Sequence, residues 1–211
     1  TEVVERHAQA LIDMEHSGCA VMFDDGKTED LKRMFALFSR VPKTLLLLQA
    51  ALSKSVRTRG TELVRDQDEQ RDPVTFVQSM LNLRDKYDAY VTQAFRKNKD
   101  FAKTLKEAFE SFVNADARVA SYLAQYADDL LRSKLRGLSE DEVEVRLDKV
   151  VVLFRYLQDK DIFESYYKQH LAKRLITGRS VSSEAERSML SKLKAECGYM
   201  FTSKLEGMFK D

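Results

Sequence analysis

The sequence is poor in residues that interrupt or cross-link a chain. It has only two prolines and seven glycines in 211 residues, and nearly all of them separate stretches with apolar residues at helical spacing. Its two cysteines, Cys19 and Cys197, each lie beside a glycine that ends a helical pattern, which is unlike a disulfide framework. We therefore predict an all-α protein with two unpaired thiols, suited to the cytoplasm or nucleus.

A charge surplus and a long apolar run are also missing. Lys and Arg total 35 against 34 Asp and Glu, so the formal net charge is +1 and the chain as a whole does not attract nucleic acid. The densest apolar run, residues 44–52, is interrupted by Gln49 and falls short of the roughly 18 residues that cross a bilayer. We expect neither nucleic acid nor a membrane as a partner. Hydrophobic residues make up 44% of the chain, enough for a packed core.

The common signatures of chemistry are absent as well. The sequence has no Gly-rich phosphate loop, no His-Glu-x-x-His pair and no Cys-x-x-Cys, so we expect no cofactor and no metal. One acidic cluster could be taken for a metal site. It falls at the start of a predicted helix, where negative charge is favoured by the helix dipole. The cluster consists of Glu140, Asp141, Glu142 and Glu144.

His170 and Cys197 are the strongest candidates for catalytic groups. His170 shares a largely apolar helix face with Phe163, and the sequence supplies no nucleophile for it to activate. Cys197 lies at a predicted helix C-terminus, a position that raises the pKa of a thiol instead of activating it. We expect His170 to be a hydrogen-bonded histidine in the core or at its boundary and Cys197 to be a packing thiol, with a helical enzyme that uses either residue as an alternative.

Helix signals divide the first half of the chain. The first helix is predicted over about residues 2–16 with Gly18 as its stop, and Thr28 is predicted to cap the next. Pro42 lies early in a further helix, whose pattern weakens at Gly60.

The charged stretch 65–71 is predicted to be an exposed loop. Asp72 and Pro73 form a cap and first-turn pair that opens a helix extending to Phe95, long enough to join two bundles. Domains are therefore predicted at 1–95 and 96–211.

Capping signals mark the second half. Ser139 to Glu142 and Ser183 to Glu186 both have the Ser-x-x-Glu pattern of a capping box, and Gly178 is predicted to close the helix between them. The connections after Phe95 are short, which places consecutive helices side by side. We predict two consecutive helical bundles, the second an antiparallel four-helix bundle.

Basic residues offer the clearest lead to a partner. One group gathers where a helix ends, a position that favours cations, and consists of Arg132, Lys134 and Arg136. A second group on a later helix consists of Lys168, Lys173, Arg174 and Arg179. Either group could receive an acidic protein tail. The alternative is ordinary solvated charge at helix ends.

Several segments carry a family resemblance. From about Asp13 to Asp211 the chain resembles the cullins, the scaffolds of modular ubiquitin ligases. The segments LFSRVP, YYKQHLAKRL and ECGYMFTSKLEGMFKD look most like the cullin-3 type.

The resemblance implies an elongated all-α fragment. Residues 1–95 would be most of the last cullin repeat, and 96–211 the four-helix bundle that opens the carboxyl-terminal domain. Such a segment is a non-catalytic scaffold that holds a substrate adaptor, of the BTB type, and a RING protein at a fixed separation, both bound through regions outside it. Cullins also present a basic groove to the acidic tail of a ubiquitin-conjugating enzyme, and Arg132, Lys134 and Arg136 match that surface. The alternative is an unrelated helical-repeat adaptor.

Overall fold

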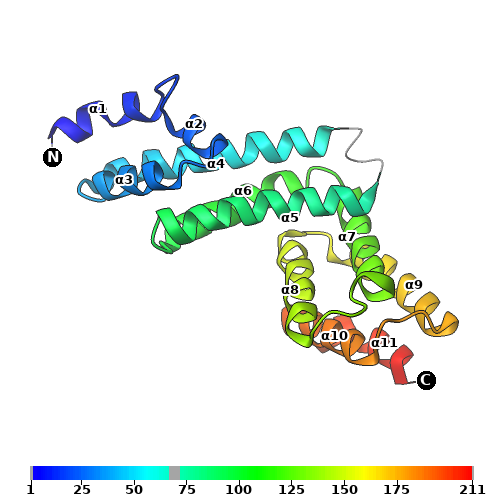
Figure 1. Cartoon of the computed structure of the whole chain (residues 1–211). Coiled ribbons are helices and arrows are strands. Elements are labelled where there is room, and N and C mark those ends of the chain that lie inside the picture. Colours follow the sequence, from blue (N-terminus) through cyan, green and yellow to red (C-terminus); the bar gives the residue numbers. More distant parts are fainter. Residues whose placement is uncertain (1, 67–71, 211) are drawn as a thin grey trace. The chain divides into compact units, whose positions relative to one another are not determined.

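A computed structural model of the chain describes residues 2–66 and 72–210, and within them the regular structure is entirely helical (Figure 1). The predicted all-α fold is therefore confirmed. Most of the predicted loop 65–71, residues 67–71, lies outside the described residues, and Arg65 is the last residue of a helix.

The helices of the first half are α1 (Glu2–Ile12), α2 (Cys19–Asp24), α3 (Thr28–Phe38), α4 (Pro42–Arg65), α5 (Pro73–Ala89) with the π-helical turn η2 (Tyr90–Ala94), and α6 (Lys99–Val113). Those of the second half are α7 (Arg118–Asp129) with the π-helical turn η3 (Leu130–Lys134), α8 (Glu140–Tyr156), α9 (Lys160–Thr177), α10 (Ser183–Cys197) and α11 (Tyr199–Lys210).

The helices form two compact units. The first contains α1 to α4 and residues 82–112, and the second contains the start of α5, up to Leu81, and the residues from Val113 onward. In the first unit α3 lies alongside α4, and in the second α10 lies alongside α11 (Figure 1). The predicted domains, residues 1–95 and residues 96–211, stay a prediction.

Aromatic side chains fill the core of the first unit. The rings of Phe95 and Phe101 are 4.5 Å apart between centroids, and the Tyr90 hydroxyl donates to the Phe23 carbonyl oxygen at 2.9 Å. Phe23 comes from α2, Tyr90 from η2 and Phe101 from α6, and Phe95 lies in the turn between η2 and α6. One cluster therefore joins elements that are distant in sequence. Buried aromatic rings contribute a large share of core stability because of the area that each buries.

Gly60 does not weaken α4, which continues to Arg65. A Cβ atom at Gly60 would lie 2.2 Å from the ring of Phe112, closer than non-bonded carbon atoms approach. The glycine is therefore a packing residue that admits an α6 side chain against α4.

Two predicted helix boundaries in the first unit are wrong. The first helix ends at Ile12, and Gly18 instead packs against the backbone, where a Cβ would lie 2.4 Å from the Ile12 carbonyl oxygen. Thr28 is the first residue of α3 and not its cap. The N-cap is Lys27, which makes no side-chain capping bond. The predicted cap at Asp72 is confirmed, since its carboxylate accepts from the backbone N–H of Thr75 at 3.2 Å.

Two helices end in π-helical turns. At η2 the Phe95 N–H donates to the Tyr90 carbonyl oxygen at 3.0 Å, five residues back. Arg96 and Lys97 then have φ angles of +54° and +55°, in the left-handed region that costs about 1–2 kcal/mol for such residues.

In the second unit α7 packs on α8 and α9, and α10 packs on α8 and α11. The capping box at the start of α8 is confirmed, because Glu142 N–H donates to the Ser139 hydroxyl and the Glu142 carboxylate accepts from Ser139 N–H at 2.9 Å. The predicted box from Ser183 to Glu186 is wrong. Ser182 is the N-cap of α10 and accepts from the backbone N–H of Ala185 at 3.0 Å.

Candidate functional site

The predicted basic group lies where α7 ends in η3. The Leu135 N–H donates to the Leu130 carbonyl oxygen at 3.1 Å, which closes the π-helical turn. The side chains of Arg132, Lys134 and Arg136 are all exposed, and we call these three residues the basic surface. The structure therefore brings the predicted candidate residues together at one helix end.

The loop after α9 is attached to the same turn. The Val181 N–H donates to the Leu131 carbonyl oxygen at 2.8 Å, a bond between residues fifty positions apart in sequence. Gly178 ends α9 with a φ angle of +60°, as predicted, and this left-handed residue directs the chain toward that bond. The backbone beneath Arg132 is thus held by a second segment of the unit.

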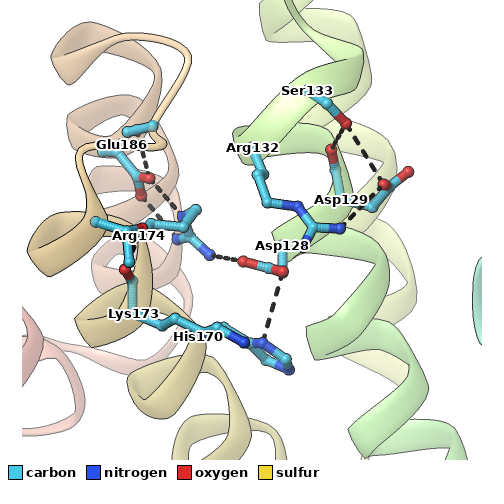
Figure 2. Close-up of polar contacts among 10 residues, drawn as sticks. Asp128, Asp129, Arg132, Ser133, His170, Lys173, Arg174 and Glu186 are labelled. Carbon is cyan, nitrogen blue, oxygen red and sulfur yellow. Dashed lines mark hydrogen bonds and ion pairs between the residues drawn. The ribbon is translucent and has the colours of Figure 1, made fainter.

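Arg174 does not belong to an exposed basic group. Its side chain is only 1% exposed, and its guanidinium donates to both oxygens of Glu186, from Nε at 2.7 Å and from Nη2 at 3.0 Å. Nη1 donates to Oδ1 of Asp128 at 2.6 Å, so Arg174 lies between two carboxylates (Figure 2). The prediction that Arg174 could receive an acidic tail is wrong, because its guanidinium is buried and paired with these two carboxylates.

These three residues form a buried network that joins three helices. Asp128 comes from α7, Arg174 from α9 and Glu186 from α10. Glu186 is fully buried and also accepts from the Ser180 hydroxyl at 2.7 Å. Burial by itself lowers the pKa of the Arg174 guanidinium, but the bonds to Glu186 and Asp128 raise that pKa above its usual value. Arg174 therefore remains charged, as a bidentate carboxylate pair requires.

The sequence contains a signal for this network, although the Ser-x-x-Glu pattern assigns Glu186 to a capping box. Arg174 lies three residues after Leu171, on the apolar face of α9, and Glu186 lies three residues before Met189 on the apolar face of α10. A charged residue in an apolar stripe is rarely buried without a partner of opposite charge. Two such residues of opposite sign on neighbouring helices indicate a buried pair.

His170 lies at the edge of this network, at the core boundary as predicted. Its Nδ1 is 3.6 Å from Oδ2 of Asp128, and the side chain is 27% exposed (Figure 2). Burial lowers the pKa of the imidazole. Asp128 raises this pKa, while the charges of Arg174, Lys173 and Arg132 lower it further.

The two thiols are poorly suited to nucleophilic chemistry. Burial raises the pKa of Cys197, in the direction predicted, and raises that of Cys19 to about 12. Cys19 is also buried with its sulfur 3.3 Å from the sulfur of Met34. A raised pKa leaves little thiolate at neutral pH, and the thiolate is the nucleophile.

Two of the four residues of the acidic cluster in α8 make structural bonds. Glu142 belongs to the capping box, and Glu144 forms an ion pair with Lys192 at 2.7 Å and accepts from Ser188. Across residues 2–66 and 72–210, no three acidic, histidine or cysteine side chains are grouped as a metal site would require. The same part of the chain contains no helix with the length and apolar character that crossing a membrane needs.

The described architecture is that of an all-helical protein. The family model described as the cullin alpha solenoid domain matches residues 1–211. Cullin-3A of Arabidopsis thaliana is 50% identical over 210 residues, which cover 100% of this chain and 29% of that protein. Cullin-3 of Dictyostelium discoideum is 48% identical over 210 residues, which cover 100% of this chain and 27% of that protein. Human Cullin-4A is 40% identical over 211 residues, which also cover 100% of this chain and 27% of that protein.

The chain belongs to the cullin family, and the predicted resemblance is confirmed. It spans less than a third of the length of these relatives. The match also excludes the alternative of an unrelated helical-repeat adaptor.

Proposed function

We propose that this chain is a non-catalytic scaffold segment of a cullin-RING ubiquitin ligase in the cytoplasm or nucleus. The observation that carries the proposal is the match of the whole chain to the cullin alpha solenoid domain. In this assignment residues 1–95 are most of the last cullin repeat, and residues 96–211, which contain α6 to α11, open the carboxyl-terminal domain. A substrate adaptor of the BTB type and a RING protein bind parts of the full-length protein outside this segment.

The segment contributes placement instead of bond-making groups. Holding two reactants at a productive separation converts an encounter between free molecules into a reaction within one complex, which is a large kinetic advantage. The described residues support this role, because the ionic partner of His170 is the carboxylate of Asp128 and the pKa of Cys197 is raised by burial. A general base needs a nucleophile within hydrogen-bond reach, and a raised pKa leaves little thiolate at Cys197.

Within this role, the basic surface receives the acidic tail of a ubiquitin-conjugating enzyme. Nη2 of Arg132 is 3.7 Å from Oδ1 of Asp129, whereas Lys134 and Arg136 form no ion pair within the described part of the chain. Three exposed cations within five residues at one helix end create a local positive potential, although the chain is nearly neutral overall. Such a surface accelerates association with an acidic partner, and it does so less at high salt.

Charge reversal in a reconstituted ligase tests the basic surface. The variant R132E/K134E/R136E is built into a full-length cullin that contains this segment, and the KM for the conjugating enzyme is measured in ubiquitin transfer. We expect KM to rise roughly tenfold at low ionic strength, which corresponds to about 1.4 kcal/mol, and the difference to shrink as salt is added.

A matched control reverses three exposed lysines of α6, in the variant K99E/K103E/K106E. It changes the net charge by the same amount and should leave KM unchanged. A KM that does not respond to R132E/K134E/R136E at any salt concentration would refute the assignment of the basic surface.

The non-catalytic role has its own test. His170→Gln and Cys197→Ser should remove no chemical activity of the isolated chain. An intrinsic turnover of the isolated chain that either substitution abolishes would favour the helical enzyme instead.

A further inference from the structure

The buried network contains more negative than positive charge. Asp128 and Glu186 supply two carboxylates, and Arg174 supplies one guanidinium, so the three residues together carry one excess negative charge when all are ionised. His170 is the titratable side chain at the solvent edge of this network, 3.6 Å from Asp128. A proton on His170 would balance the excess charge.

Charged groups from three elements decide whether His170 holds that proton. Asp128 faces His170 from α7 and favours the imidazolium, whereas Arg132 faces it from η3, with Lys173 and Arg174 on α9 itself, and these three cations oppose it. Partial burial opposes it as well, so the pKa of His170 lies below its ordinary value of about 6.5. At neutral pH the imidazole is therefore uncharged.

An acidic segment on the basic surface changes this balance. Carboxylates paired with Arg132 reduce the repulsion that Arg132 exerts on His170, and they add an attraction of their own. The side chain of His170 is partly exposed, so a proton can reach it from solvent. Lys173 is exposed on the same helix as His170 and extends the cationic surroundings of the ring.

We propose that binding of an acidic partner segment to the basic surface is coupled to protonation of His170, which then contributes a further positive charge to the site. The inference rests on the proposed function, since it requires the basic surface to bind such a segment. Coupling between two binding events is reciprocal, so the segment must bind more tightly at lower pH by the same factor by which it promotes protonation.

Peptide binding at two pH values tests the coupling. The probe is a fluorescent deca-aspartate peptide, whose own carboxyl groups, with pKa values of about 3.9, stay ionised in the range used. Fluorescence anisotropy at constant ionic strength should show binding to the whole chain roughly three- to tenfold tighter at about pH 6 than at about pH 8, since one pKa unit corresponds to a tenfold change.

The matched control is His170→Gln, which keeps a polar side chain of similar size but cannot gain charge. Because the variant retains His7 and His16, the difference from wild type isolates His170. We expect most of the pH dependence to disappear in H170Q. Equal pH dependence in H170Q and wild type would overturn the coupling and leave the basic surface intact, whereas no binding at either pH, even at low salt, would overturn both.

A second measurement does not require the peptide. The imidazole signal of His170, identified by its loss in H170Q, can be titrated by NMR in wild type and in Arg132→Gln. Removing the Arg132 charge should raise the pKa of His170, in the same direction as a bound carboxylate. An unchanged titration in R132Q would show that the basic surface and His170 are independent, and would refute the proposal.

Discussion

Replacing Arg174 by Met tests the structural importance of the buried network most severely. The substitution removes the guanidinium but keeps an unbranched side chain of comparable length, so little of the loss should come from an empty cavity. It removes the cationic donor from the carboxylates of Glu186 and Asp128, which are 0% and 11% exposed, although the Ser180 hydroxyl still donates to Glu186. Removal of one partner of a buried ion pair typically costs about 3–5 kcal/mol, because it leaves an uncompensated charge. We expect a loss of that size for R174M.

Urea unfolding followed by circular dichroism measures the loss, and hydrogen exchange in α9 and α10 shows whether it arises in the second unit. Arg6→Met is the matched control, because Arg6 forms an exposed pair with Glu2 and such pairs contribute little. The triple variant R174M/D128L/E186L removes the stranded charges and should recover most of the lost stability. An unfolding free energy of R174M within about 1 kcal/mol of wild type would refute this reasoning, as would a triple variant no more stable than R174M.

Two further substitutions test the packing and capping assignments. Gly60→Ala should destabilise the chain by about 1–3 kcal/mol, because the new methyl group overlaps the ring of Phe112, whereas Gly207→Ala, at an open helical position, should stabilise it by up to about 1 kcal/mol. Equal effects of the two in urea unfolding would contradict the close approach. Ser182→Ala should lower the helix stability by about 1 kcal/mol through loss of the cap, and Ser183→Ala should not. Thermal melts that rank the two serines in the reverse order would restore the capping box read from the sequence.

Features that depend on neighbouring residues could be predicted from the sequence. The capping box at Ser139, the cap at Asp72 and the left-handed end of α9 at Gly178 each involve groups within a few positions, and the structure confirms all three. Local signals of this kind mark these helix ends because the first and last turns must satisfy their own backbone groups, whereas the signals at Thr28 and Ser183 are each displaced by one residue.

Features that depend on distant residues were missed. Gly60 was expected to weaken a helix, although it makes room for Phe112 from another helix. Glu186 was assigned to a cap because the pattern before it fits one, yet its carboxylate is taken by Arg174, twelve positions away. Tertiary contacts of this kind outweigh local propensity, and no local pattern contains them.

The candidate site was predicted in part. The exposure and grouping of Arg132, Lys134 and Arg136 agree with the sequence analysis, and their role as tail contacts stays a prediction. The sequence analysis does not predict the buried network of Asp128, Arg174 and Glu186. It groups Arg174 with the exposed cations and assigns no role to Asp128.

A charge-swap measurement tests whether the basic surface binds the acidic tail of the conjugating enzyme. The R132E/K134E/R136E ligase is assayed with a conjugating enzyme whose acidic tail residues are replaced by lysines, alongside both single alterations. If the tail binds this surface through charge, each single alteration should raise KM and the combination should restore it toward the wild-type value, with a salt dependence like that of the wild-type pair. Losses that simply add in the combination would contradict the claim, because they would show that the tail and the basic surface do not interact.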